Sequence, residues 1–248
     1  LWIIDDLTVF HQLDKNVAKK EMFLYKPKDA YNLAGGRGRT SRTAGTNHSG
    51  GVNMYYYIKE LNDKDVVSIS ISDANDKVIK TFSTKPNKDL KEGKLNVKEG
   101  NNIFNWNMMY DGAESVKGMI LWWASLSGPM ALPGNYKATL KLNDKTQSET
   151  FTILKNPISE ATESDMKAQF DFIQDINTKM TEIHKALKNV KKVRSQVGLL
   201  KKSIKDKEAN KELIDFADQL VKDITTIEET LYQTKSKSGQ DPLNFPIR

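Results

Sequence analysis

The sequence predicts an α+β chain in which an antiparallel β-sandwich is followed by a pair of long antiparallel helices. Between residues 52 and 156, apolar and polar residues alternate through several short runs, which is the pattern of half-buried strands. From residue 157 to 248, apolar residues recur at helical spacing instead. We therefore predict three regions, at residues 1–51, 52–156 and 157–248.

The first region, residues 1–51, is predicted to be a strand followed by a linker. It opens with the apolar, strand-like run LWIIDDLTVFHQL, in which Trp2, Ile4 and Leu7 alternate. The run EMFLYKPKDAYNL is predicted to be an extended connection, because Pro27 disfavours helix at the residue before it. The next stretch, AGGRGRTSRTAGTNHSGG, buries too little apolar surface to offset its ordering entropy and is predicted to be a mobile loop.

The second region, residues 52–156, is predicted to be the sandwich. The runs VIKTF and SETFTIL are two of its strands, and SDANDK and Asn143-Asp144 are turns, because Asp and Asn bond their own backbone. Several short strands within about a hundred residues are typical of an antiparallel sandwich. The residues predicted to face its core are Met54, Tyr56, Ile58, Val67, Ile69, Ile71, Phe104, Trp106, Met108, Tyr136, Ala138, Leu140 and Leu142.

The third region, residues 157–248, is predicted to be a helical hairpin. Thr162 and Asp165 form a capping-box pattern at its start. An apolar seam, interrupted at Arg194, predicts packing against the second helix or against another molecule. The seam residues are Ile173, Ile176, Met180, Ile183, Leu187, Val190 and Val197, and those of the second helix are Leu213, Phe216, Leu220, Ile224, Ile227 and Leu231.

Composition excludes some kinds of chemistry and leaves others open. The 248 residues contain no Cys, which excludes disulfides, thiolate zinc sites and cysteine nucleophiles. The net charge is +6, and Lys is mixed with Glu and Asp along the chain, so we predict no nucleic-acid binding. No apolar run approaches the ~20 residues that span a bilayer. We predict no cofactor.

Several polar motifs are better explained by structure than by chemistry. His11, His48 and His184 are far apart and form no pair at helical ligand spacing, so no metal site is predicted. Asp5 and Asp6 are adjacent and point to opposite faces of a strand, which does not suit a glycosidase pair. The run GGRGRTSR lacks a P-loop ending, and DANDK lacks the ligands of a calcium loop.

Five stretches, in their order along the chain, resemble a known family. They are LWIIDDLTVFHQL, LYKPKDAYNL, NNIFNWNMMYDGA, GMILWWASLSGPMALPGNYKATLKLNDK and QDPLNFPIR. Together they are similar to the C-terminal region of bacterial secreted proteins with a sortilin-type β-propeller, described as BNR-repeat or glycosyl-hydrolase-like. The most specific part is the turn formed by Gly128, Pro129, Ala131, Pro133, Gly134 and Tyr136.

The resemblance implies a context for the chain. It implies that the run at residues 1–7 is the last strand of a propeller, that region 52–156 is an Ig-like sandwich, and that a further helix follows Arg248. It also implies an extracytoplasmic location. Any catalytic residue would lie in the propeller, so we predict that this chain is not itself an enzyme.

Trp122 and Trp123 are the most informative candidate site residues. Neighbouring residues of a strand face opposite ways, so one ring can be in the core while the other stacks on a sugar. With Pro129, Pro133 and Tyr136 they form a predicted ledge for ligand binding or docking, although packing in the sandwich explains them too. We predict a non-catalytic accessory region that acts as spacer and docking module, with the propeller as partner. Alternatives are a carbohydrate-binding module that uses the ledge, or a module that self-associates through its helices.

Overall fold

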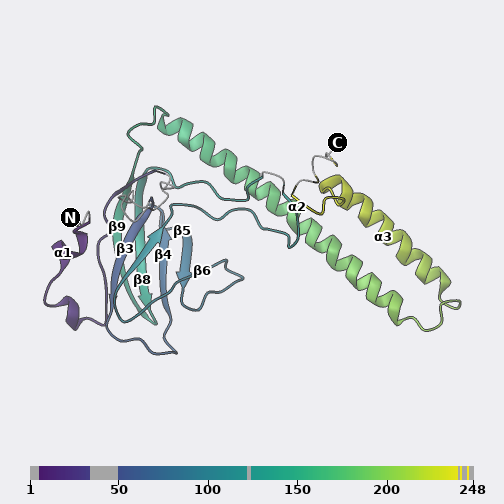
Figure 1. Ribbon diagram of the computed structural model, residues 1–248, viewed down its shortest axis with the longest axis horizontal. Helices are drawn as coiled ribbons and strands as arrows, with labels where there is room; N and C mark the ends of the chain where they lie inside the picture. The colour runs from purple at the N-terminus through teal and green to yellow at the C-terminus, as the bar shows by residue number, and fades with distance from the viewer. Residues whose placement is uncertain (1–5, 34–49, 122–123, 240, 242–244, 246–248) are drawn as a thin grey trace. The chain divides into compact units, whose positions relative to one another are not determined.

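The computed structural model describes the chain except for residues 1–5, 34–49, 122–123, 240, 242–244 and 246–248 (Figure 1). The fold is mixed α+β, as predicted, with β-sheets and two long helices. The chain divides into two compact units. The first unit comprises residues 1–111 and 129–171, and the second comprises residues 112–128 and 172–248.

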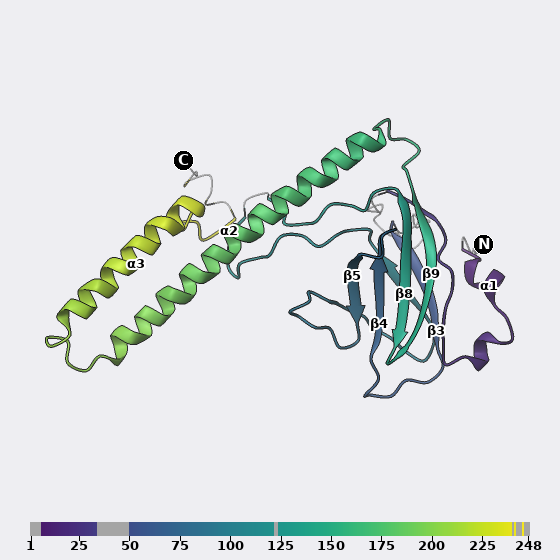
Figure 2. The ribbon, with the colours of Figure 1, turned by 180° about the vertical axis from the view of Figure 1, so that it is seen from behind.

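The first unit contains two β-sheets (Figures 1 and 2). The smaller sheet has the order β1-β3-β7, formed by β1 (Met22–Leu24), β3 (Val52–Ile58) and β7 (Gly100–Trp106). The larger sheet has the order β2-β9-β8-β4-β5-β6, formed by β2 (Ala30–Tyr31), β9 (Lys145–Leu154), β8 (Gly134–Leu142), β4 (Val67–Ser72), β5 (Val78–Ser83) and β6 (Gly93–Lys94). Neighbouring strands are antiparallel except for the pairs β2–β9 and β5–β6.

The two sheets share one apolar core. Residues along β3 are alternately buried and half-buried, so that Met54 and Tyr56 face the core while Tyr55 lies on the outer face. The larger sheet contributes Ile69 and Leu140 to the same core, and both are fully buried. Burying one such side chain stabilises the fold by about 1.5–3 kcal/mol, so the alternation decides which face of each strand turns inward.

Two strands lie where only an extended connection was predicted. β1 and β2 are short, and each pairs with a strand distant in sequence: Met22 lies opposite Ile58, and Ala30 opposite Ile153. The alternation of neighbouring residues therefore could not predict these strand pairings. The two strands belong to different sheets, so the segment between them crosses from one sheet to the other.

The strand-like run at the start of the chain contains a short helix. Residues Thr8–Gln12 form α1, and Val17–Lys19 form the 3-10 turn η1. The Asp6 carboxylate accepts the Thr8 backbone N–H at 2.9 Å, an Asx turn that favours helix over continued strand. Trp2, Ile4 and the predicted Gly/Arg loop lie outside the described residues.

The two long helices are α2 (Glu163–Ser203) and α3 (Lys211–Leu231). The predicted capping box at the start of α2 is confirmed, because the Asp165 N–H donates to the Thr162 hydroxyl at 3.1 Å and the Thr162 N–H donates to the Asp165 carboxylate at 2.9 Å. Figures 1 and 2 show α3 alongside the C-terminal half of α2. The interruption of the seam at Arg194 has a structural reason, since its guanidinium is paired at 2.6 Å with the buried Glu228 of α3.

The segment at residues 112–128 completes the second unit. Its ends approach closely, and the Ala113 N–H donates to the Leu126 carbonyl at 2.9 Å. A Cβ added at Gly112 would lie 1.7 Å from that carbonyl oxygen, so only glycine fits there. The segment is tied to α2 where the Glu114 N–H donates to the Thr181 hydroxyl at 3.1 Å.

Candidate docking surface

The predicted ledge is only partly within the described residues. Trp122 and Trp123 lie outside them, so their role stays a prediction. Pro129 is buried and Pro133 is half-buried. The two prolines flank Ala131, whose N–H donates to the Met108 carbonyl at 2.7 Å.

Tyr136, the last residue of the predicted ledge, lies in the core of the first unit. Its side chain is 6% exposed, and its ring stacks on Phe151 with centroids 5.9 Å apart. The hydroxyl donates to the Leu132 carbonyl at 2.7 Å. Burial, followed by the charges of Tyr110 and Asp73, raises the pKa of Tyr136. The ring therefore stabilises the fold and is not available to stack on a ligand.

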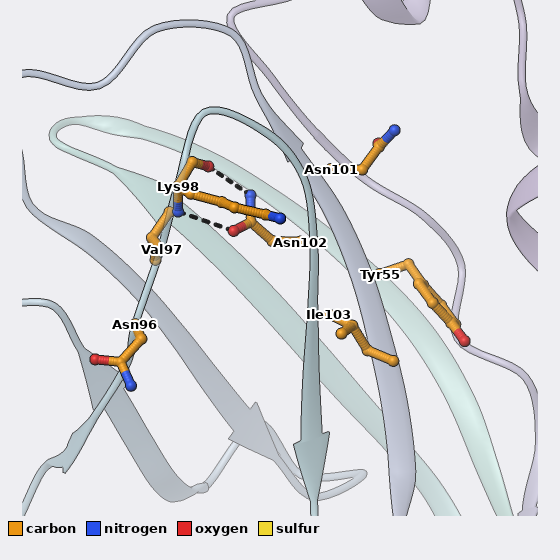
Figure 3. A pocket seen from close by; sticks show the side chains of 7 residues that line it. All are labelled: Tyr55, Asn96, Val97, Lys98, Asn101, Asn102 and Ile103. Carbon is orange, nitrogen blue, oxygen red and sulfur yellow. Dashed lines mark hydrogen bonds between the residues drawn. The ribbon is translucent and has the colours of Figure 1, made fainter.

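A shallow groove lies on another part of the first unit, beside β7. It has a volume of about 460 Å³ and opens at the surface (Figure 3). Its lining combines an aromatic ring, aliphatic carbon and amide groups. The lining residues are Tyr55, Asn96, Val97, Lys98, Asn101, Asn102 and Ile103.

The groove is built by strand register and by one bridging amide. Tyr55 of β3 lies directly opposite Ile103 of β7, and Ile103 is 56% exposed. The Asn102 side chain donates to the Lys98 carbonyl at 2.7 Å and accepts the Lys98 N–H at 2.9 Å (Figure 3). This pair of bonds holds residues 96–98 beside the start of β7, where they form one wall.

A carboxylate from the N-terminal segment orients Tyr55. Its hydroxyl is hydrogen-bonded to Asp6. Burial and the Asp6 charge raise the pKa of Tyr55. Burial opposes ionisation of Asp6, but hydrogen bonds from Thr8 and Tyr55 and the charge of Lys28 lower its pKa overall. The Tyr55 ring is thereby fixed at the groove, and Asp6 acts as a positioning group.

The outer edge of β7 has no strand beside it among the described residues. The Tyr55 carbonyl points away from β7, because it accepts the Tyr25 N–H from the β1 side at 3.0 Å. Residues opposite each other in an antiparallel pair either bond both ways or point their polar groups apart. Ile103 therefore directs its N–H and C=O away from β3, and Asn101 and Asn105 do the same two residues away.

The sequence contains one feature that relates to this site. Apolar residues of β7 should fall at alternate positions, as Phe104 and Trp106 do, yet Ile103 lies between them. An isoleucine at an outer position of a strand is an exposed apolar group without a place in the core. Single exposed apolar residues are common on protein surfaces, and Ile103 stands out because it lines the groove together with Tyr55.

The second unit contains a buried histidine that was predicted to flank the seam. His184 is fully buried on α2. Its Nδ1 donates to the Glu114 carbonyl. Its Nε2 has no hydrogen-bond partner among the described residues. Within that part of the chain, no group of three His, Asp or Glu residues could hold a metal ion.

The remaining predicted features have structural explanations. The run at residues 73–77 is a turn in which the Asp73 carboxylate accepts the N–H groups of Asn75 and Lys77 at 2.9 and 3.0 Å. The predicted stripe of α3 is mostly exposed and none of its residues is buried. The buried residues of α3 are Ala217 and Glu228, which lie outside the predicted stripe. The exposed stripe residues are Leu213, Phe216, Ile227 and Leu231. None of the described helices is long and apolar enough to cross a membrane.

Comparison of the chain with models of known protein families gave no match, and comparison with curated proteins gave none either.

Proposed function

We propose that this chain is a non-catalytic accessory module that acts as a docking unit and a spacer. The observation that carries the proposal is the groove beside the open edge of β7. Its lining offers one tyrosine ring, an exposed isoleucine, several amides and the side chain of Lys98, which can make both apolar contacts and hydrogen bonds with a partner. An open strand edge recognises another protein through backbone hydrogen bonds, and a neighbouring pocket adds side-chain specificity.

We propose that the two sheets of the first unit form an Ig-like sandwich, and the strand order supports this. A small sheet β1-β3-β7 faces a large sheet in which β2 runs parallel to β9. The Tyr136 hydroxyl bonds the backbone four residues upstream at the start of β8. A tyrosine corner of this kind is a hallmark of Ig-type sandwiches.

The spacer role is supported by α2. Its 41 residues extend for about 60 Å at ~1.5 Å per residue. Ion pairs of Lys201 with Asp218 and of Arg194 with Glu228 join α2 to α3. These pairs support an antiparallel hairpin, in which α3 packs alongside α2 and runs in the opposite direction.

The parent protein remains the one implied by the family resemblance, an exported protein with a β-propeller. Sequencing the coding DNA on both sides of this segment tests that context. Repeated blades and a signal peptide upstream are the expected result. A start codon directly before Leu1 would contradict it.

Amide exchange tests the docking function itself. In the dilute isolated chain, the amides of Asn101, Ile103 and Asn105 should exchange rapidly, because they point to solvent. In the longest polypeptide that the coding DNA encodes, or in a complex, the same amides should be protected. Rapid exchange in every such form would contradict docking at β7.

A further inference from the structure

The outer edges of the two sheets differ in length and in composition. The edges β2 and β6 have two residues each, and β1 has three. β7 has seven residues, and its sequence GNNIFNW contains no Lys or Pro. Proteins commonly protect sheet edges with short strands, Lys or Pro, because open edges pair with other chains. β9 and β5 also keep residues without a neighbouring strand, because β2 pairs only with Ile153 and Leu154 of β9 and β6 only with Phe82 and Ser83 of β5. Those two strands contain Lys145 and Lys80. Among these three described strands, β7 alone has neither Lys nor Pro.

We propose that β7 pairs antiparallel with β7 of a second copy of this chain, about a two-fold axis that passes beside Ile103. This inference rests on the proposed docking function and names its partner. The outward-pointing residues Asn101, Ile103 and Asn105 are spaced symmetrically about Ile103. In this register Ile103 lies opposite Ile103 of the second copy, and Asn101 lies opposite Asn105. Each of these pairs exchanges both of its backbone hydrogen bonds, and the two small sheets become one.

The side chains of the symmetric register are chemically complementary. The Asn101 amide oxygen accepts the Tyr25 hydroxyl at 3.3 Å, which leaves its NH₂ group without a partner among the described residues. The Asn105 NH₂ group donates to the Asn53 side chain at 2.8 Å and to the Gly50 carbonyl at 3.1 Å, which leaves its oxygen as an acceptor. A free donor thus faces a free acceptor twice, once on each side of the axis.

The apolar groups of the register are also matched. Ile103 is 56% exposed, and pairing covers it with its own copy. Directly opposite aliphatic side chains stabilise a strand pair, and like charges in the same place destabilise it. A homodimer with closed two-fold symmetry uses one surface twice, which is the commonest solution for soluble oligomers.

Solution mass of the full chain tests the pairing. Light scattering over a range of concentrations should show a monomer–dimer equilibrium at neutral pH. Ile103→Lys places two ammonium groups opposite each other and should weaken the dimer at least about tenfold. Val78→Lys is the matched control, because Val78 is also 56% exposed and lies on β5. It should leave the dimer unchanged, and both variants should retain the wild-type circular dichroism.

Single cysteines test the register, because the chain contains none of its own. With a short bis-maleimide, Ile103→Cys should cross-link to itself, and Val78→Cys should not. Asn101→Cys and Asn105→Cys should cross-link efficiently only when the two variants are mixed. A result in which each cross-links to itself better than to the other would contradict this register.

Two outcomes overturn the inference. The first is a monomer at every concentration, and the second is a dimer that survives Ile103→Lys but is lost in Phe216→Lys on α3, which would assign association to the helices. The proposed docking function fails separately, since it requires only that the β7 amides be protected in the longer polypeptide. Protection there, together with a monomeric isolated chain, would retain docking and exclude the second copy as partner.

Discussion

The two units of this protein have interiors of different chemistry. The first unit buries aliphatic and aromatic side chains from both sheets in one continuous core, including Met54, Ile71 and Trp106. In the helical unit, several of the most buried residues are polar, among them His184 and Glu228. One unit is stabilised mainly by apolar burial, and the other also buries charged and polar groups, such as the Arg194–Glu228 pair. Substitutions should therefore cost stability for different reasons in each unit.

The largest expected effect is that of Trp106→Ala in the first unit. Trp106 is fully buried and contacts the rings of Tyr136 and Phe151. Its removal leaves a cavity and should lower the free energy of unfolding by about 3–5 kcal/mol. Urea unfolding followed by tryptophan and tyrosine fluorescence measures this loss. Ile103→Ala, at an exposed site of the same strand, should cost far less, and equal losses would contradict an apolar core at Trp106.

A polar interior in the second unit predicts an asymmetric response of the Arg194–Glu228 pair. The Glu228 side chain is 6% exposed and that of Arg194 is 33% exposed. Arg194→Met strands a buried carboxylate and should cost about 3 kcal/mol, whereas Glu228→Gln leaves a guanidinium that water can reach and should cost about 1 kcal/mol. Urea unfolding monitored by the helical circular-dichroism signal compares them. Equal losses would mean that Glu228 is not held in a low-dielectric site.

Tyr56 places a polar hydroxyl group inside the otherwise apolar core of the first unit. Its hydroxyl has no partner among the described residues, and burial raises the pKa of Tyr56 to about 12 from 10.0. The folded state keeps this proton after the unfolded chain has lost it. The associated stability is therefore fully present below about pH 10 and is lost as the pH rises to about 12, by about 2–3 kcal/mol.

Tyr56→Phe tests that assignment. The variant should be at least as stable as the wild type at pH 7, because it removes an unpaired buried hydroxyl. Its stability should also fall less steeply between about pH 10 and about pH 12. Tyr136→Phe is the matched comparison, because it removes a hydroxyl that is bonded to Leu132, and it should cost about 1 kcal/mol at pH 7. Equal changes in the free energy of unfolding for the two variants at pH 7 would contradict the difference between an unpaired and a bonded hydroxyl.

A smaller effect is expected where α2 begins. Thr162→Ala removes the hydroxyl that accepts the Asp165 N–H and should cost about 1 kcal/mol. Hydrogen bonds from Thr162 also lower the pKa of Asp165. An NMR titration of the variant should give a pKa for Asp165 that is closer to the ordinary value of an aspartate. An unchanged titration would mean that the capping box does not persist in solution.

The smallest expected effect on stability is at the predicted tryptophan ledge, and it decides an alternative function. If Trp122 and Trp123 bind sugars, the double substitution Trp122→Ala and Trp123→Ala should abolish glycan binding with little change in unfolding. A glycan array with wild-type and variant chains provides the measurement. No binding by the wild type to a broad panel would remove the carbohydrate-binding alternative.

The sequence alone determined the local structure. Alternation in residues 52–58 and 134–142 predicted β3 and β8, because a strand between core and solvent places every second side chain inward. Thr162 and Asp165 predicted the start of α2, because the capping bonds join residues three apart. In each case the relevant partners lie within a few positions of one another, so their chemistry can be read along the chain.

Only the tertiary structure decided which residues form the surface of a site. β1 and β2 depend on partners far along the chain, and the buried His184 donates to the carbonyl of Glu114, which is 70 residues away in sequence. The open edge of β7 exists because no other described strand reaches it, which is a property of sheet order rather than of the run GNNIFNW. Strand order and edge exposure are set by long-range pairing, and local periodicity does not encode them.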